Sequence, residues 1–64
     1  MPITAKEAVR ILKAAGFEQV GQKGSHVKLK HKDGRQTIIP LHRGDLKAGT
    51  QHAIEKQTGI KLVP

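Results

Sequence analysis

One histidine stands in a setting where it could perform acid–base chemistry. His26 directly follows Gly24 and Ser25, and Lys28 lies two positions further along the chain. Because the reference pKa of a histidine side chain is about 6.5, it can act as a base or an acid near neutral pH. A lysine beside it could stabilise the negative charge that develops on a reacting phosphate. A non-catalytic role also fits, because a lone histidine at the start of a strand is usually a solvated surface residue.

Further groups could bind the phosphates of an anionic partner. A glycine turn lets a polynucleotide backbone approach closely, and its N–H groups could contact a phosphate oxygen. The Gly49-Thr50 pair, near the start of an expected helix, resembles an anion-binding helix N-terminus. The candidate phosphate-binding residues are Lys23, Gly24, Ser25, Lys28, Lys30, Arg43 and Lys47. Exposed lysines also deter edge pairing between sheets, and glycine at a helix start also serves ordinary capping, so both alternatives stay open.

The other three histidines have weaker claims to a role. His42 follows the third expected strand and could serve as a second acid or a phosphate donor, or it could bond a backbone carbonyl. His31 and His52 are expected to be solvated. Because His26 and His31 are five residues apart on one strand, they point to opposite faces, and no nearby pair has the spacing of metal ligands. We therefore expect neither a metal site nor a cofactor.

Periodicity and turn residues predict five elements in the order α-β-β-β-α. Thr4 and Glu7 have the spacing of a capping box at the start of the first helix. Asp33 and Gly34 are typical of a hairpin connection, and Gly59 is suited to end the second helix. The predicted elements are a helix over 5–15, strands over 17–22, 26–31 and 36–41, and a helix from 47 or 48 to 58.

These elements predict an α+β fold in which both helices cover one face of a three-stranded antiparallel sheet. Strand alternation directs Val27 and Leu29 into the core. The residues of that strand expected on the open face are His26, Lys28 and Lys30. In the second helix, Ala53 and Ile54 are expected to point inward. An apolar segment should then fold back over the core, namely Ile60, Leu62 and Val63.

Length and charge limit the class of protein. A chain of 64 residues allows a single domain over residues 1–64. Its 12 Lys and Arg against 5 Asp and Glu give a net charge of +7, which suits nucleic acid or an anionic membrane surface. The expected helices are too short and too rich in alanine for membrane binding. With no signal peptide and no apolar run of spanning length, the expected location is the cytoplasm.

The residue types that are missing are also informative. There is no cysteine, so disulfides and cysteine metal sites are excluded. Phe17 is the single aromatic residue. Domains that splay bases across a sheet need several stacking aromatics, so nucleic acid would be held here mainly through phosphates, riboses and shape.

Four short motifs in this order and spacing resemble a known family. They are Gly24-Ser25-His26, Asp33-Gly34-Arg35, Pro40-Leu41-His42 and Gly49-Thr50. The chain is similar over essentially its whole length to HicA-type toxins, the small mRNA-cleaving half of a toxin–antitoxin pair. Family members often carry proline before the Gly-Thr pair, whereas this chain has Ala48, a departure that bears on helix geometry rather than chemistry.

The resemblance implies a fold, an activity and a partner. The fold should be like that of a double-stranded-RNA-binding domain. The activity should be ribosome-independent cleavage of mRNA, with His26 as the single catalytic histidine. A HicB-type antitoxin should bind and mask that surface. Two other functions stay open beside this one: a non-catalytic module that binds double-stranded RNA or DNA, and a domain that binds an acidic protein. A histidine directly after the Gly-Ser turn favours the catalytic hypothesis.

Overall fold

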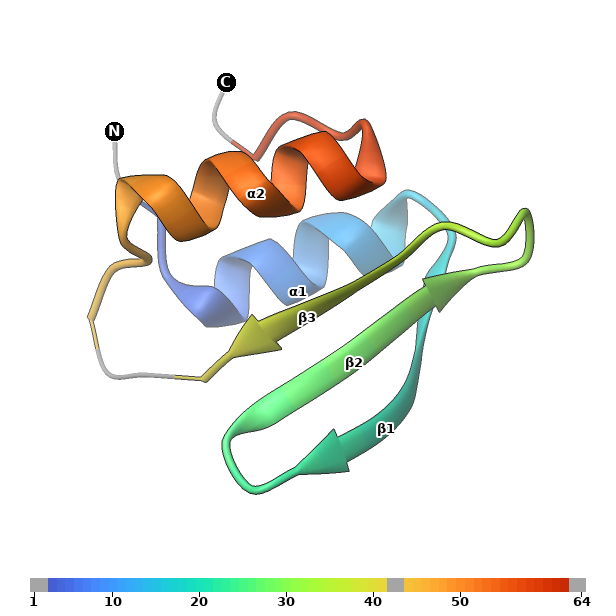
Figure 1. The fold of residues 1–64 in the computed structure, drawn as a ribbon, viewed down its shortest axis with the longest axis horizontal. Helices are drawn as coiled ribbons and strands as arrows, with labels where there is room; N and C mark the ends of the chain where they lie inside the picture. The colour runs from blue at the N-terminus through green and yellow to red at the C-terminus, as the bar shows by residue number, and fades with distance from the viewer. Residues whose placement is uncertain (1–2, 42–43, 63–64) are drawn as a thin grey trace.

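The computed structural model has the predicted element order and describes residues 3–41 and 44–62 (Figure 1). The elements are α1 (Ala5–Ala14), β1 (Phe17–Lys23), β2 (His26–His31), β3 (Gln36–Pro40) and α2 (Ala48–Thr58). The predicted α+β fold class and the limits of strand 26–31 are confirmed. The other predicted ends differ by at most one residue.

The predicted N-cap residue, Thr4, starts α1 and makes the first of the two bonds of a capping box. Thr4 has an extended backbone, and its hydroxyl accepts a hydrogen bond from the Glu7 N–H at 3.2 Å. This bond satisfies one of the N–H groups that the first turn of a helix leaves without a partner. The helix ends one residue earlier than predicted because Ala15 is its C-cap. The Ala15 N–H donates to the carbonyls of Ile11 and Leu12, and the Gly16 N–H donates to the carbonyl of Lys13.

The sheet is antiparallel, with β2 between β1 and β3. The β2–β3 connection is a tight turn in which the His31 carbonyl accepts from Gly34 N–H at 2.9 Å and the His31 N–H donates to the Arg35 carbonyl at 2.8 Å. Gly34 has φ 102, so this turn uses the glycine that the sequence supplies. A bulge between Gln19 and Gly21 interrupts the β1–β2 register.

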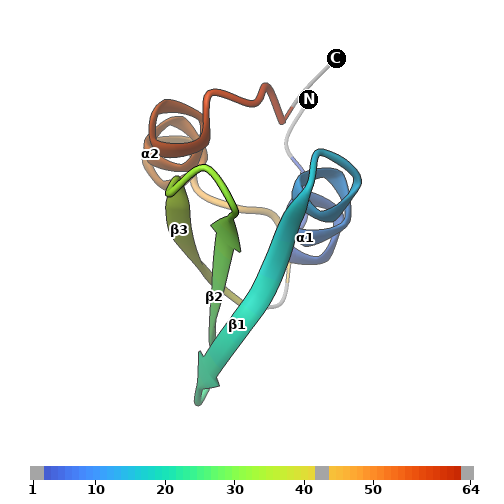
Figure 2. The ribbon, with the colours of Figure 1, turned by 90° about the vertical axis from the view of Figure 1, so that its right-hand side faces the viewer.

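The two faces of the sheet differ as predicted. Val27, Leu29 and Ile39 are buried and belong to one core with buried residues of both helices, Leu12 and Ile54 among them. The alternate side chains of β2 are exposed, namely His26, Lys28 and Lys30. In Figure 2, α1 lies on one side of the sheet, and α2 is displaced towards the β3 edge. Neither helix in the described ranges is long and apolar enough to cross a membrane.

The expectation for α2 was partly wrong. Ile54 is buried, but Ala53 is exposed. Because α2 lies along the edge strand β3, it buries only a narrow stripe and its neighbouring flank stays open (Figure 2). The C-terminal segment does fold back, since Leu62 is buried and Ile60 packs against the core. Val63 lies outside the described residues.

The β2–β3 turn is tied to the end of α2 by one arginine. The Arg35 guanidinium donates to the Thr58 carbonyl, donates to the Asp33 carboxylate at 2.8 Å and lies 5.4 Å from the centre of the Phe17 ring. A cation at a helix C-terminus interacts favourably with the carbonyls there. The Arg35 backbone N–H also donates to the Asp33 carboxylate, which holds the pKa of that group below its ordinary value of 3.8.

Replacing Arg35 by alanine should therefore destabilise the fold by about 1–3 kcal/mol, because the Thr58 carbonyl loses a charged donor. The measurement is urea unfolding followed by circular dichroism. Lys32→Ala is the matched control, since Lys32 is an exposed residue of the same turn. The control should stay within about 0.5 kcal/mol of the wild type. Equal unfolding midpoints for the two variants would contradict this role of Arg35.

Candidate active site

The turn before His26 is built by glycine. Lys23 pairs with His26 across β1 and β2, so only Gly24 and Ser25 form the connection. Gly24 has φ 59 at the first turn position, which is the pattern of a type II′ hairpin turn. A side chain added at Gly24 would meet none of the described atoms within 4 Å. The turn is therefore open on that side to an approaching polynucleotide backbone.

His26 emerges from this turn onto the open face. It pairs with Lys23 of β1 and with Pro40 of β3, and its side chain is exposed. Leu41 N–H donates to the Ser25 carbonyl just beyond the His26–Pro40 pair. Since hydrogen-bonded and non-hydrogen-bonded pairs alternate, His26 and Pro40 form a close non-hydrogen-bonded pair. This position also suits Pro40, which has no N–H to donate.

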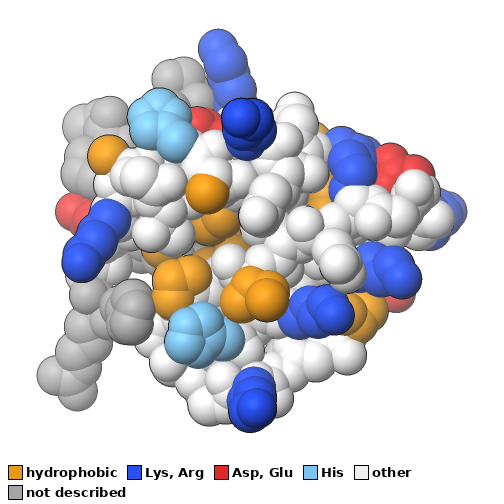
Figure 3. All heavy atoms as spheres, viewed as in Figure 1, with side chains coloured by type: hydrophobic (Ala, Val, Ile, Leu, Met, Phe, Trp, Pro, Cys, Tyr) orange, Lys and Arg blue, Asp and Glu red, His pale blue; other side chains and the backbone are white. Residues whose placement is uncertain are grey.

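A shallow hollow of about 250 Å³ surrounds the histidine. Its lining comprises Gly21, Gln22, Lys23, His26, Lys28 and Ile38. The structure thus brings together three residues that the sequence singled out, namely Lys23, His26 and Lys28. Gly21 lies opposite Lys28 in the register. Because Gly21 carries no side chain, only backbone borders the hollow at this point of β1. Figure 3 shows lysine, histidine and hydrophobic side chains close together over the strands.

The other predicted phosphate-binding residues are spread more widely. Lys30 lies outside the histidine hollow; it pairs with Glu18 of β1 and lines a separate hollow near Gly16. Lys47 is the N-cap of α2, is exposed and makes no side-chain capping bond. Arg43 and His42 lie outside the described residues. The structure therefore groups the turn residues and Lys28 around His26, whereas Lys30 and Lys47 stand apart.

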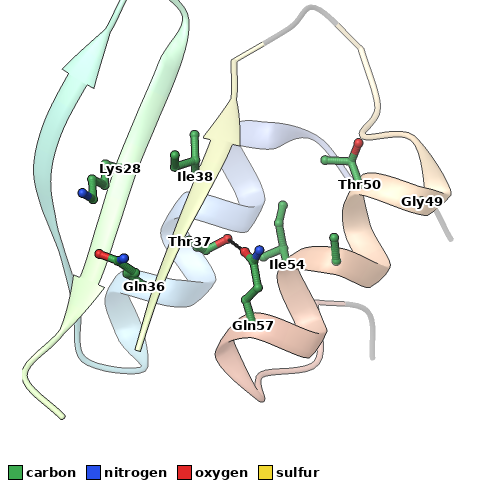
Figure 4. A pocket seen from close by; sticks show the side chains of 9 residues that line it. Lys28, Gln36, Thr37, Ile38, Gly49, Thr50, Ile54 and Gln57 are labelled. Atoms are coloured by element: carbon green, nitrogen blue, oxygen red, sulfur yellow. Dashed lines mark hydrogen bonds between the residues drawn. The ribbon is translucent and has the colours of Figure 1, made fainter. Parts of the chain in front are cut away.

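A second hollow adjoins the first on the α2 side. It is a groove of about 480 Å³, and it shares Lys28 and Ile38 with the histidine hollow. From α2 it is lined by Thr50, Ala53 and Gln57, among others. Figure 4 shows Lys28 and Gln36 on the β2 side of Ile38, and α2 on the other side. The two hollows thus meet at Lys28 and Ile38, on a surface made by β2, β3 and α2.

The sequence did not single out Ile38, although it lies at the centre of this surface. Ile38 is 53% exposed and pairs with Lys28 in the β2–β3 register, while the neighbouring Ile39 is buried. With two isoleucines in succession, alternation cannot decide which one belongs to the core. Gln57 and Ala53 were noticed only as helix residues, so the groove itself was missed.

His31 corrects one expectation. It was expected to be solvated, but its side chain is only 18% exposed and its ring contacts Phe17 edge-on at 5.1 Å between centroids. A side chain at Gly16 would come within 2.9 Å of His31 Nε2, so the missing side chain makes room for this ring.

His52 is solvated as expected, with 79% of its side chain exposed. Among residues 3–41 and 44–62, no group of three potential ligands could hold a metal ion.

The fold and the site define a class of protein. An α-β-β-β-α chain with an antiparallel sheet is like a double-stranded-RNA-binding domain, and its open face presents a histidine between lysines. The model of a family described as the HicA toxin of bacterial toxin–antitoxin matches residues 5–60. The chain therefore belongs to the HicA toxin family. A search of curated proteins gave no match.

Family membership supports a general role. HicA proteins are known as mRNA-cleaving toxins. The chain is thus assigned a toxin role in a toxin–antitoxin system, with RNA as the substrate in general and a cognate antitoxin as the partner.

Proposed function

We propose that this protein is a ribosome-independent, metal-independent mRNA endoribonuclease with His26 as its catalytic histidine. The observation that supports the proposal most directly is the exposed hollow in which His26 lies between Lys23 and Lys28. A site on an open sheet face admits a polymer from either direction, which a substrate as long as mRNA requires. Since mRNA is the substrate, the protein would act in the cytoplasm.

In the proposed reaction, His26 takes the proton from a ribose 2′-hydroxyl. The 2′-oxygen attacks the adjacent phosphorus, a 2′,3′-cyclic phosphate forms, and the bond from phosphorus to the 5′-oxygen of the next nucleotide breaks. The imidazolium formed at His26 can return the proton to that leaving oxygen. His42, outside the described residues, is the second candidate for this acid.

The cationic groups around His26 would stabilise the charge that builds on the phosphate. Lys23 and Lys28 line the same hollow as the histidine, so either ammonium group can approach the phosphate oxygens there. The N–H groups of Gly24 and Ser25 lie at the exposed turn and are further candidates. Phosphates further along the RNA would be contacted by Lys30, Lys47 and Arg43.

The partner in this proposal is a HicB-type antitoxin that covers the open face. Such a partner would bury His26 and present acidic groups to the lysines of β2. The exposed Ile38 at the centre of that face would be covered at the same time. Occlusion of this kind would stop cleavage without any change in the toxin fold.

One observation favours a second candidate function, a non-catalytic module for double-stranded RNA or DNA. Among the described residues, no side-chain hydrogen bond orients the His26 ring, whereas a catalytic base is often held by a further group. Under this alternative, the same basic face would bind nucleic acid and leave it intact. Cleavage of purified RNA separates the two candidates.

In cells, induced expression of the chain is expected to arrest growth and deplete mRNA, because the enzyme would cleave transcripts without needing ribosomes. Growth after induction and RNA sequencing measure the effect. Co-expression of the antitoxin, expected to be encoded beside the toxin gene, should restore growth. Arrest with intact mRNA would contradict the proposed activity.

A further inference from the structure

The groove beside His26 combines apolar walls with a polar end. Ile38 of β3 rises on one side, and Ala53 of α2 lies exposed on the other. Ile54 is only 2% exposed and lies at the bottom between them. A hollow with aliphatic side chains on opposite sides can hold a flat ring by its two faces.

The polar end of the groove is the amide of Gln57. Thr37 is only 3% exposed, and its hydroxyl donates a hydrogen bond to the Gln57 side-chain oxygen at 2.6 Å. This bond, drawn in Figure 4, ties one end of the amide to β3. Within residues 3–41 and 44–62, the Gln57 amide nitrogen makes no hydrogen bond, and an amide group can bond the edge of a nucleobase.

The groove also lies close to the candidate catalytic group, His26. His26 and Lys28 are two residues apart on β2, which separates them by about 7 Å along the strand. This is on the scale of one nucleotide of an extended chain. Since Lys28 lines both hollows, it can bind a phosphate that joins the two positions.

The aromatic residue most suited to stacking on a base is not accessible in this fold. Phe17 is the single aromatic residue of the chain, and at 2% exposure it is buried in the core. No phenylalanine, tyrosine or tryptophan ring is therefore available on the described surface to stack on an unpaired base. Aliphatic walls at Ile38 and Ala53 provide the alternative.

We propose that this groove binds one unstacked nucleobase of the RNA, in the nucleotide adjacent to the phosphate that His26 attacks. The inference rests on the proposed RNA cleavage and adds a substrate class to it: the RNA is single-stranded where it is cut. Ile38 and Ala53 contact the base faces, and Gln57 contacts its edge. The base, once seated, holds the neighbouring ribose and phosphate at His26.

The test uses the full chain and short RNA oligonucleotides with a single cleavable position. Cleavage requires a 2′-hydroxyl, so an oligonucleotide that is 2′-deoxy everywhere except at one ribose is cut at one place only. In companion oligonucleotides, the base on either side of that position is removed to leave an abasic residue. Removal at one of the two positions should lower kcat/KM by about tenfold, the scale of one lost base contact.

The matching protein variant is Ala53→Leu, which fills the groove from an exposed helix position that tolerates leucine. It should lower kcat/KM on the intact oligonucleotide by about tenfold and have little further effect on the abasic one. His52→Leu is the control, because it places the same side chain at the preceding exposed position, outside the groove lining. The control should cleave both oligonucleotides as the wild type does.

Three other outcomes of these experiments would overturn or separate the two proposals. Unchanged cleavage of the intact oligonucleotide by Ala53→Leu overturns the proposal. Unchanged cleavage with lost antitoxin binding overturns it as well and makes the groove part of the antitoxin interface. If the wild type cleaves no RNA, the proposed catalysis fails, and binding of a 2′-O-methyl oligonucleotide then tests the groove alone. In that case, an abasic residue or Ala53→Leu must still weaken binding about tenfold, or the groove inference fails too.

Discussion

The His26→Ala variant is expected to cleave RNA about 10²–10⁴-fold more slowly than the wild type, the usual contribution of a general acid–base group. Without the imidazole, the ribose 2′-hydroxyl keeps its proton and attacks phosphorus only slowly. The lysines that would stabilise the phosphate charge remain in place, so some cleavage above background should persist. RNA affinity should change little, because the phosphate contacts are made by other groups.

Single-turnover cleavage of a labelled RNA by purified protein measures this effect. His26 is exposed on the open face and contributes nothing to the core, so the variant should have the same thermal unfolding midpoint as the wild type. His52→Ala removes another exposed histidine, in α2, and should cleave normally. A His26→Ala variant that cleaves as fast as the wild type would refute the proposed mechanism. Binding without cleavage by every version would favour the non-catalytic module.

Local chemistry explains why so much of the fold could be predicted. The period-2 alternation from His26 to His31 has no exception, so it fixed both the limits and the faces of β2. The Thr4 cap is a contact over three residues, and it forms as the spacing predicts. The surroundings of His26 follow from the same features, because the Gly24 turn and β2 alternation together place Lys23 and Lys28 beside it.

The parts that could not be predicted depend on partners distant in the sequence. His31 is half-buried because Gly16 leaves room for its ring and Phe17 pairs with it across the sheet. Ala53 is exposed because α2 lies along β3 rather than over the centre of the sheet (Figure 2). The groove has the same origin, since it exists only where that helix runs beside Ile38. Alternation within β2 already directed His31 to the face opposite His26, but no pattern within one element encodes the partners that cover its ring, the position of α2 or the groove.

The β2 strand links the stability of the fold to the candidate site, because alternate residues serve the core and the RNA face. Leu29 is 0% exposed and lies between Lys28 and Lys30, on the opposite side of the strand. Leu29→Ala should cost about 2–5 kcal/mol, since it removes buried carbon atoms and leaves a cavity. A single core in a domain of this length rarely supplies more than about 3–5 kcal/mol of net stability. The variant should therefore lose a large part of its free energy of unfolding.

Urea and thermal unfolding followed by circular dichroism would show this directly. Lys30→Ala changes the next residue of the same strand, where the side chain is exposed, and should shift stability by no more than about 0.5 kcal/mol. Both changes shorten a side chain of β2 to alanine, so the difference in stability between the two variants reports whether the side chain lies on the core face or on the open face of the sheet. If the two variants unfolded alike, the helices would not cover the Leu29 face. The imidazole of His26 would then lose its place on open surface, and the proposed active site would fail together with the packing.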